Sequence, residues 1–221
     1  MTRTLLCLGL AVVGATSHAT ILTFDIAGAT NASGISQDYG DNVTATTMGA
    51  FGYGDTHGFT PDVVTEYDGF GATEELNFWT TGYSDLTNVA EYEPDGAPGF
   101  AINLVASGGN LVELHGFDLG NFGSEITIPS LTITDEANNV LFSQTNFVLP
   151  VWSTPHLSFD FGTPLVGQTI RIAFDLTGLG GNSDNVGIDN IAFSQAPVPE
   201  PMTLVGLAAG IGALARRRRN K

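Results

Sequence analysis

The chain has 221 residues, of which 14% are charged, and its formal net charge is −16 at pH 7. Only Arg171 of its seven lysines and arginines lies in residues 20–198, whereas twenty-two of the twenty-three acids do, so this stretch carries about −21. Nucleic-acid affinity comes largely from Lys and Arg, so this composition excludes a nucleic acid as a partner. The length suits one domain with a sizeable core.

The N-terminus has the pattern of a secretory signal. Residues 1–3 are short and basic, residues 5–13 are apolar, and Ser17 and Ala19 are small residues at the two positions that signal peptidase reads. We expect residues 1–19 to be a signal peptide and Thr20 to start the mature protein; a short buried helix is the alternative. Cys7, the only cysteine, lies in this signal, so the mature protein is expected to lack disulfides and zinc-thiolate sites.

Beyond the signal, apolar residues alternate with period two, which is typical of half-buried strands. Residues 31–92 are less regular, and we expect long loops there with two or three short strands. The candidate strands are residues 21–26, 100–106, 111–119, 126–134, 140–148, 156–161, 169–176 and 186–193. Glycine-rich turns separate them, so the sequence predicts an all-β antiparallel sandwich of jelly-roll type over residues 20–194, followed by a linker at residues 195–198.

Aromatic residues in the irregular half are candidates for ligand binding. Flat rings beside Asp and Asn side chains suit stacking on sugars, whereas the same rings are also ordinary core filling. The ligand candidates are Tyr39, Trp79, Tyr83 and Trp152. An extracellular polysaccharide is the partner that this interpretation implies.

In the last predicted strand, Asp189 does not fit the alternation of apolar and polar residues. Asp189 shares strand parity with Ile191 and Phe193, so either a bulge lies near Asp189 and Asn190 or the carboxylate points inward. A buried carboxylate needs a partner, and we expect Arg171 to pair with Asp175 instead.

Calcium, which favours six to eight oxygen ligands, is one solution to that conflict. The candidate ligands are Asp25, Asp184, Asn185 and Asp189. The alternative is that Asp189 accepts hydrogen bonds from backbone N–H groups at a bulge, and the sequence leaves both open.

Catalytic motifs are absent: there is no nucleophile elbow, zinc-protease motif, phosphate loop or dinucleotide fingerprint. His57, His115 and His156 are isolated in the sequence, and the adjacent Glu74 and Glu75 do not establish a glycosidase pair. We therefore expect a protein that is not an enzyme.

The chain ends with Pro199, Glu200 and Pro201, a stretch of fourteen uncharged residues (202–215), and Arg216, Arg217, Arg218 and Arg219. As a helix that stretch spans about 21 Å against a hydrocarbon core of about 30 Å. Basic residues are enriched on the cytoplasmic side, so we expect everything before residue 202 to lie outside the cytoplasm. A plain membrane anchor is the alternative to a sorting signal.

Residues 199–221 closely resemble the PEP-CTERM sorting domain, which has the same three features in the same order. The resemblance implies a bacterial protein that is exported and recognised by a membrane-embedded exosortase. That enzyme cuts at or near the Pro-Glu-Pro and passes its substrate to the cell surface or extracellular matrix. The expected function is therefore a non-enzymatic surface or matrix protein of structural or interaction type. A calcium-dependent carbohydrate-binding module is the alternative, and an extracellular hydrolase is a third reading.

Overall fold

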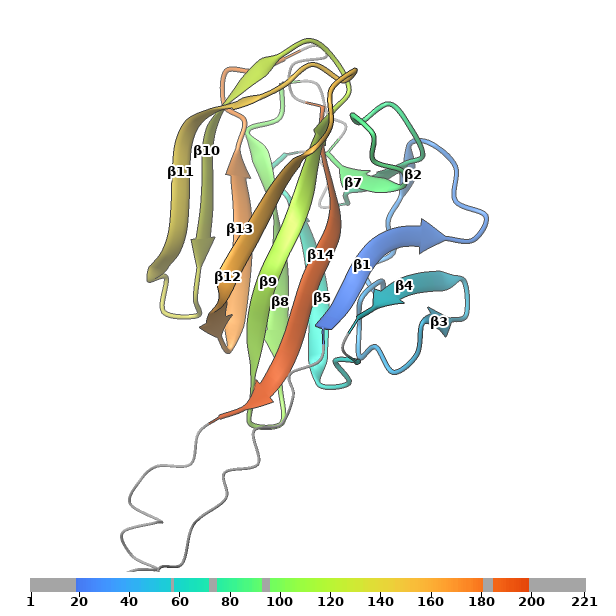
Figure 1. Cartoon of the computed structure of the whole chain (residues 1–221), viewed down its shortest axis with the longest axis vertical. Coiled ribbons are helices and arrows are strands. Elements are labelled where there is room, and N and C mark those ends of the chain that lie inside the picture. The colour runs from blue at the N-terminus through green and yellow to red at the C-terminus, as the bar shows by residue number, and fades with distance from the viewer. Residues whose placement is uncertain (1–18, 57, 72–74, 93–95, 181–184, 199–221) are drawn as a thin grey trace, which may run out of the picture.

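The computed structural model describes residues 19–56, 58–71, 75–92, 96–180 and 185–198. These residues form fourteen β-strands and no helix, in two antiparallel sheets that face each other across the core (Figure 1). The all-β expectation is confirmed. No helix in the described ranges is long and apolar enough to span a membrane. The expected signal peptide and the whole sorting segment lie outside the described residues.

The smaller sheet has five strands in the order β11-β10-β13-β8-β5. Its strands are β11 (Val140–Leu149), β10 (Ile126–Thr134), β13 (Thr169–Asp175), β8 (Gly99–Ala106) and β5 (Val63–Gly69). Six of the eight predicted strands match observed strands, here or in the larger sheet, to within two residues at each end. The bounds of β10 match the prediction exactly, and buried positions alternate with more exposed ones on either side of a break at Pro129 and Ser130.

The larger sheet has nine strands and divides at β14. On one side of β14 (Val186–Pro197) lie β9 (Asn110–Asn121) and then β12 (Leu157–Gly167). On the other side are two separate branches, one starting with β1 and the other with β7. The first branch is β1 (Ala19–Ile26), β4 (Phe51–Asp55) and β3 (Thr47–Met48); the second is β7 (Val89–Glu91), β6 (Asn77–Trp79) and β2 (Ser33–Gly34).

The core forms where the apolar faces of the two sheets meet. Along β13, Ile170, Ile172 and Phe174 point inward and are fully buried. Phe117 of β9 stacks on Phe159 of β12, with ring centroids 5.0 Å apart, and meets Phe174 edge-on at 6.4 Å. Phe117 therefore joins both sheets, and burial of such apolar area is the main favourable term in folding.

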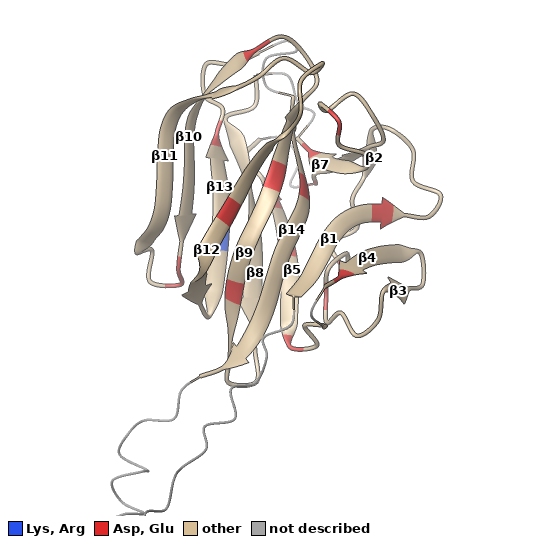
Figure 2. Cartoon of the chain, viewed as in Figure 1, with Lys and Arg blue, Asp and Glu red and all other residues tan. Residues whose placement is uncertain are grey.

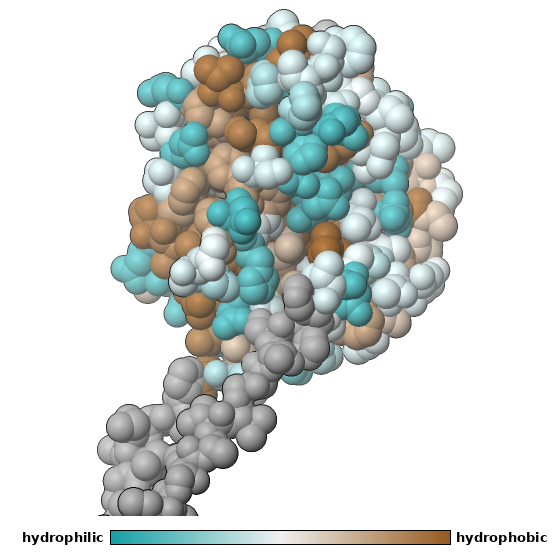
Figure 3. All heavy atoms as spheres, in the orientation of Figure 1, coloured by the Kyte–Doolittle hydropathy of each residue, from teal (hydrophilic) through white to brown (hydrophobic). Residues whose placement is uncertain are grey.

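On one side of the sandwich lie the edge strands β11 and β12, each of which has a sheet partner on one side only. Phe142 and Phe147 of β11 pack there against Phe159 of β12. Apolar side chains gather over this side of the molecule (Figure 3). Val140, Val148 and Val166 are among the exposed large hydrophobic residues.

Two sequence expectations are corrected by the strands themselves. Residues 31–92 hold six strands rather than two or three, among them the seven-residue β5. Its inward positions are Val63, Thr65 and Tyr67, and the polar threonine obscured the alternation. Residues 195–197, expected as a linker, continue β14 and pair with residues 110–112 of β9.

The expected pairing of Arg171 with Asp175 is also wrong. Arg171 donates from Nη2 to Asp68 Oδ2 at 2.9 Å and from Nη1 to Asn103 Oδ1 at 3.0 Å. The strand register explains these contacts. Arg171 lies opposite Asn103 in β8, and β8 pairs on its other side with β5, which carries Asp68. Arg171 is the one lysine or arginine in the described ranges, and Figure 2 shows acids on strands of both sheets. The acids of the larger sheet therefore receive no arginine from the described residues.

Replacing Phe117 tests the packing of the two sheets. Phe117→Ala is expected to lower the free energy of unfolding by about 3–5 kcal/mol, because it removes ring contacts with both sheets and leaves a cavity. Urea denaturation measures this. Val140→Ala is the matched control, since Val140 is 61% exposed and its truncation should change stability by no more than about 0.5 kcal/mol. Equal losses in the two variants would contradict this account of the core.

Candidate functional site

The candidate site lies where the larger sheet divides. One edge of β14 pairs with β7 at Gly187 and Ile188 and with β1 from Ile191 to Ser194. Asp189 and Asn190 lie between these two stretches and have no strand partner on that edge. We call this point, together with the branches that leave it, the fork.

Backbone irregularities on both strands shape the fork. In β1 the register with β4 shifts between Leu22 and Asp25, and Phe24 has a φ of 50°. In β14 the register with β9 shifts after Asp189, and Asn190 has a φ of 51°. The sequence left open a bulge near Asp189 and Asn190 or an inward-pointing carboxylate, and the structure has both. Bulges re-aim side chains, and a positive φ at a bulky residue such as Phe24 costs energy that the surrounding packing must offset.

Phe24 is held in its strained conformation by aromatic packing. Its ring centroid lies 5.2 Å from that of Tyr39 and 6.4 Å from that of Tyr67, and all three residues are buried. Tyr67 also donates a hydrogen bond to the Tyr39 carbonyl at 2.9 Å. This cluster fixes the bulge of β1 and with it the position of Asp25.

A polar cavity of about 340 Å³ opens at the fork. Asp25 and Asp189 line it from two strands, while Asp85 and His156 line it from loops. Its full lining is Thr23, Asp25, Asp85, Leu86, Thr87, His156, Asp189 and Asn190. The structure thus brings together Asp25 and Asp189, two residues that the sequence singled out and that are 164 positions apart.

A chain of polar contacts closes one side of this cavity. His156 Nδ1 lies 2.8 Å from Asp85 Oδ1, and its Nε2 lies 3.5 Å from Asp118 Oδ1. Asp118 Oδ2 accepts a hydrogen bond from Asn190 Nδ2 at 3.0 Å. The interactions with His156 hold the pKa of Asp85 below its usual range. Sequence reasoning gave no role to His156, Asp85 or Asp118, because only the fold brings them together.

Asp189 is the most perturbed carboxyl of the site. It is 4% exposed, and it lies directly opposite Asp118 in the β14–β9 pair. Burial raises the pKa of Asp189 to about 8, with smaller contributions from the charges of Asp118 and Asp25. Its Oδ1 accepts the backbone N–H of Asn190 at 2.7 Å. The capping role foreseen as an alternative to metal binding is therefore present at this bulge.

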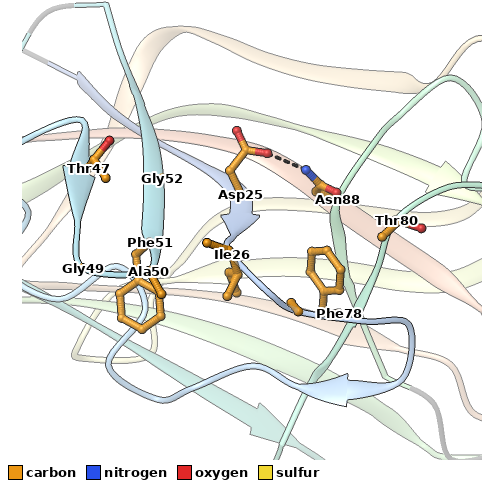
Figure 4. Close-up of a pocket in the computed structure, with 12 residues that line it drawn as sticks. Asp25, Ile26, Thr47, Gly49, Ala50, Phe51, Gly52, Phe78, Thr80 and Asn88 are labelled. Atoms are coloured by element: carbon orange, nitrogen blue, oxygen red, sulfur yellow. Dashed lines mark hydrogen bonds between the residues drawn. The ribbon is translucent and has the colours of Figure 1, made fainter.

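A second cavity, of about 410 Å³, adjoins the first and shares Asp25 with it. It lies between the branches: Phe51 and Gly52 come from β4, Phe78 from β6, and Ile26 from β1. Asn88, at the entrance to β7, donates a hydrogen bond from Nδ2 to Asp25 Oδ1 (Figure 4). The Phe51 and Phe78 side chains lie on either side of Ile26 in this view. The polar and the apolar cavity together form the fork cleft.

The calcium candidates are only partly brought together. Asp25 and Asp189 share the polar cavity, Asn185 lies just before β14 without lining it, and Asp184 lies outside the described residues. No group of three or more His, Cys, Asp or Glu residues in the described ranges could hold a metal ion. Since one of the four expected ligands is not described, calcium binding stays a prediction.

The aromatic candidates lie in different environments. Tyr39 is fully buried and stacks on Tyr53 at 5.1 Å, and Tyr83 is buried against Phe122, so neither ring offers a face to a sugar. Both are core side chains because glycine and aromatic neighbours leave room for their rings; a Cβ at Gly187 would come within 2.6 Å of the Tyr83 ring. Trp79 is half-buried beside Phe122, and Trp152 is 53% exposed.

His115 contacts a buried serine. Its Nε2 lies 2.8 Å from Ser194 Oγ, which donates to Glu113 Oε2 at 2.9 Å. Ser194 is fully buried in β14. His57 and Glu74 lie outside the described residues.

No known protein family matches this chain, and no curated protein matches it as a relative. The site is interpreted from its own geometry.

The pKa of Asp189 makes stability depend on pH. An unfolded Asp has a pKa of about 3.9, so between about pH 4 and the folded value of about 8 the native state binds the extra proton. The contribution of Asp189 is complete below pH 4 and is lost as pH rises through 8. We expect the free energy of unfolding to fall by up to about 1.4 kcal/mol per pH unit in that window.

The Asp189→Asn variant should lack this slope, since the amide resembles the protonated carboxyl but does not titrate. Urea denaturation of both proteins from pH 5 to pH 9 measures the difference, which should grow with pH and then level off. Parallel curves would show that Asp189 titrates normally.

Proposed function

We propose that this chain is an exported, non-enzymatic protein of the bacterial cell surface or extracellular matrix, sorted through its C-terminal segment. The observation that carries the proposal is the order of Pro199-Glu200-Pro201, the apolar residues 202–215 and the arginines 216–219 at the end of the chain. Signal peptidase and an exosortase are the processing partners. The membrane segment serves as a temporary anchor until the exosortase acts.

The arrangement of the described chain ends supports this proposal. Ala19 pairs with Ser194, and the Val198 N–H donates to the Gly109 carbonyl at 2.9 Å. Both ends therefore leave the domain at one end of β14. The fork at Asp189 lies five residues up that strand from Ser194, about 16 Å away. A domain tethered by its C-terminus would keep the fork cleft clear of the tether.

We also propose a specific type of β-sandwich for the ectodomain. From β8 onward the chain crosses between the sheets at nearly every connection, and only the β10–β11 hairpin stays within one sheet. Such alternation is typical of a jelly roll, and we assign the ectodomain to that type. Jelly rolls are frequent scaffolds for extracellular binding, which suits an interaction role.

Replacing Pro199, Glu200 and Pro201 together by alanine tests the sorting proposal. In a host that has an exosortase, the variant should remain full-length in the membrane fraction, because the enzyme loses its recognition element. Immunoblots of membrane and medium, with mass spectrometry of the C-terminus, measure this. Glu125→Ala, which alters an exposed residue of the domain, is the control and should be processed. Normal processing of the triple variant would overturn the proposal.

A second candidate function is a calcium-dependent carbohydrate-binding module. The observation that favours it is the cavity shared by Asp25 and Asp189, beside an apolar cavity lined by Phe51 and Phe78. Carboxylates suit calcium and sugar hydroxyls, and aromatic rings suit sugar faces. Under this reading an extracellular polysaccharide is the partner.

Thermal melts with millimolar calcium and with a chelator test the metal part of this candidate. A ligand that binds only the native state stabilises it by about 2.7 kcal/mol at a hundredfold excess over its Kd. The upward shift in Tm should vanish in Asp25→Asn and persist in Glu66→Gln, which changes the same charge on the other sheet. An unchanged Tm in calcium would rule out calcium binding.

A glycan array tests the sugar-binding part of this candidate. Binding to the array should disappear with the chelator and in Trp79→Ala.

A further inference from the structure

The two halves of the fork cleft differ in chemistry. The larger cavity presents apolar surface from Ile26, Phe51 and Phe78, and the smaller one presents carboxylates, with Asp25 at the boundary. Their volumes, about 410 and 340 Å³, lie within the range of about 300–1,000 Å³ found for small-molecule sites. A ligand that fills both must have an apolar part and a polar end.

The polar end faces an unbalanced set of charges. Asp25, Asp85, Asp118 and Asp189 surround or border the polar cavity, and His156 is the only basic residue among the described groups that contact them. His156 faces Asp85 and Asp118, which leaves Asp25 and Asp189 without a cationic partner among the described residues. Asp25 is held by the neutral donors Asn88 and Thr23.

The burial and hydrogen bonding of Asp189 also indicate a ligand, independently of this count of charges. Asp189 is only 4% exposed, yet it lines the cavity. One oxygen, Oδ1, accepts the Asn190 N–H, and Oδ2 accepts no hydrogen bond from the described residues. An unpaired carboxyl oxygen of a residue that lines a cavity can accept a hydrogen bond there, so an N–H group from a ligand at this position would be favoured.

A primary ammonium group fits these requirements better than a metal ion or a neutral hydroxyl. It brings positive charge and three N–H donors, which suit carboxylates that are too dispersed to form a metal-binding group. A neutral sugar would bring no positive charge to Asp25, which has no cationic partner among the described residues. An alkyl chain attached to the ammonium would lie against the apolar cavity.

We propose that the fork cleft binds a primary alkylammonium ion, with the ammonium between Asp25 and Asp189 and the alkyl chain along Ile26, Phe51 and Phe78. The same chemistry occurs in free polyamines and in lysine side chains of a partner protein. The proposal goes beyond sorting and does not depend on it.

Calorimetry with n-butylammonium chloride on the full protein tests the proposal, with n-butanol as the neutral probe of equal shape. Tetramethylammonium, which has no N–H donor, separates hydrogen bonding from charge screening. We expect saturable binding of butylammonium alone. At least tenfold weaker binding is expected in Asp189→Asn and in Asp25→Asn, and unchanged binding in Glu66→Gln. Asp25 is exposed, so its variant should fold even if Asp189→Asn does not.

Several results would overturn the proposal. These are equal responses to butylammonium and butanol, equal responses to butylammonium and tetramethylammonium, or the same affinity in all three variants. Calcium binding without any butylammonium binding would also overturn it, while leaving the second candidate function intact. Tighter binding of spermidine would support a free polyamine as the source, and tighter binding of Nα-acetyl-lysine methylamide would support a lysine side chain.

Discussion

The fork cleft exists because two strands pair with the same edge of β14. Two strands, β7 and β1, pair with that edge, and they approach from different parts of the domain. The backbone between them at Asp189 and Asn190 gains no ladder hydrogen bond there, although buried backbone groups need partners. The Asn190 N–H is satisfied locally by Asp189 Oδ1, which turns the carboxyl into part of the backbone structure. Burial of an acid is thus built into the way the sheet divides.

That arrangement is expensive for a chain with so few cations. A buried carboxylate is normally compensated by a basic side chain, but Arg171 serves Asp68 on the smaller sheet. The larger sheet resolves the conflict by keeping a proton on Asp189, whose pKa burial raises to about 8. Asp189 thus accepts a backbone hydrogen bond at the bulge and also lines the polar cavity.

The sequence predicted most of the longer strands because they alternate cleanly. In β13, for example, every second residue is a large apolar one. It failed where polar residues point inward, as Thr65 does in β5, and where strand ends look like linkers, as residues 195–197 do. It indicated an irregularity at Asp189, as a bulge or an inward-pointing carboxylate, because parity changes within a few residues, which is a local signal.

Contacts distant in sequence were beyond such reasoning. Nothing near His156 indicates that it meets Asp85 and Asp118, and nothing near Tyr39 shows that it is buried beneath Tyr53. The pairing of Arg171 was missed for the same reason, since it depends on β5 and β8 lying side by side. Asp25 and Asp189 were both predicted as calcium ligands, and the structure places them in one cavity.

The most direct test of the central claim is the titration of Asp189 followed by NMR. The chemical shift of its side-chain carboxyl carbon, assigned by comparison with Asp189→Asn, reports the charge of that group alone. The account predicts a midpoint near pH 8, set by burial at the fork. A midpoint near 4, the value of a solvated aspartate, would mean that Asp189 is open to water and that the fork creates no buried acid.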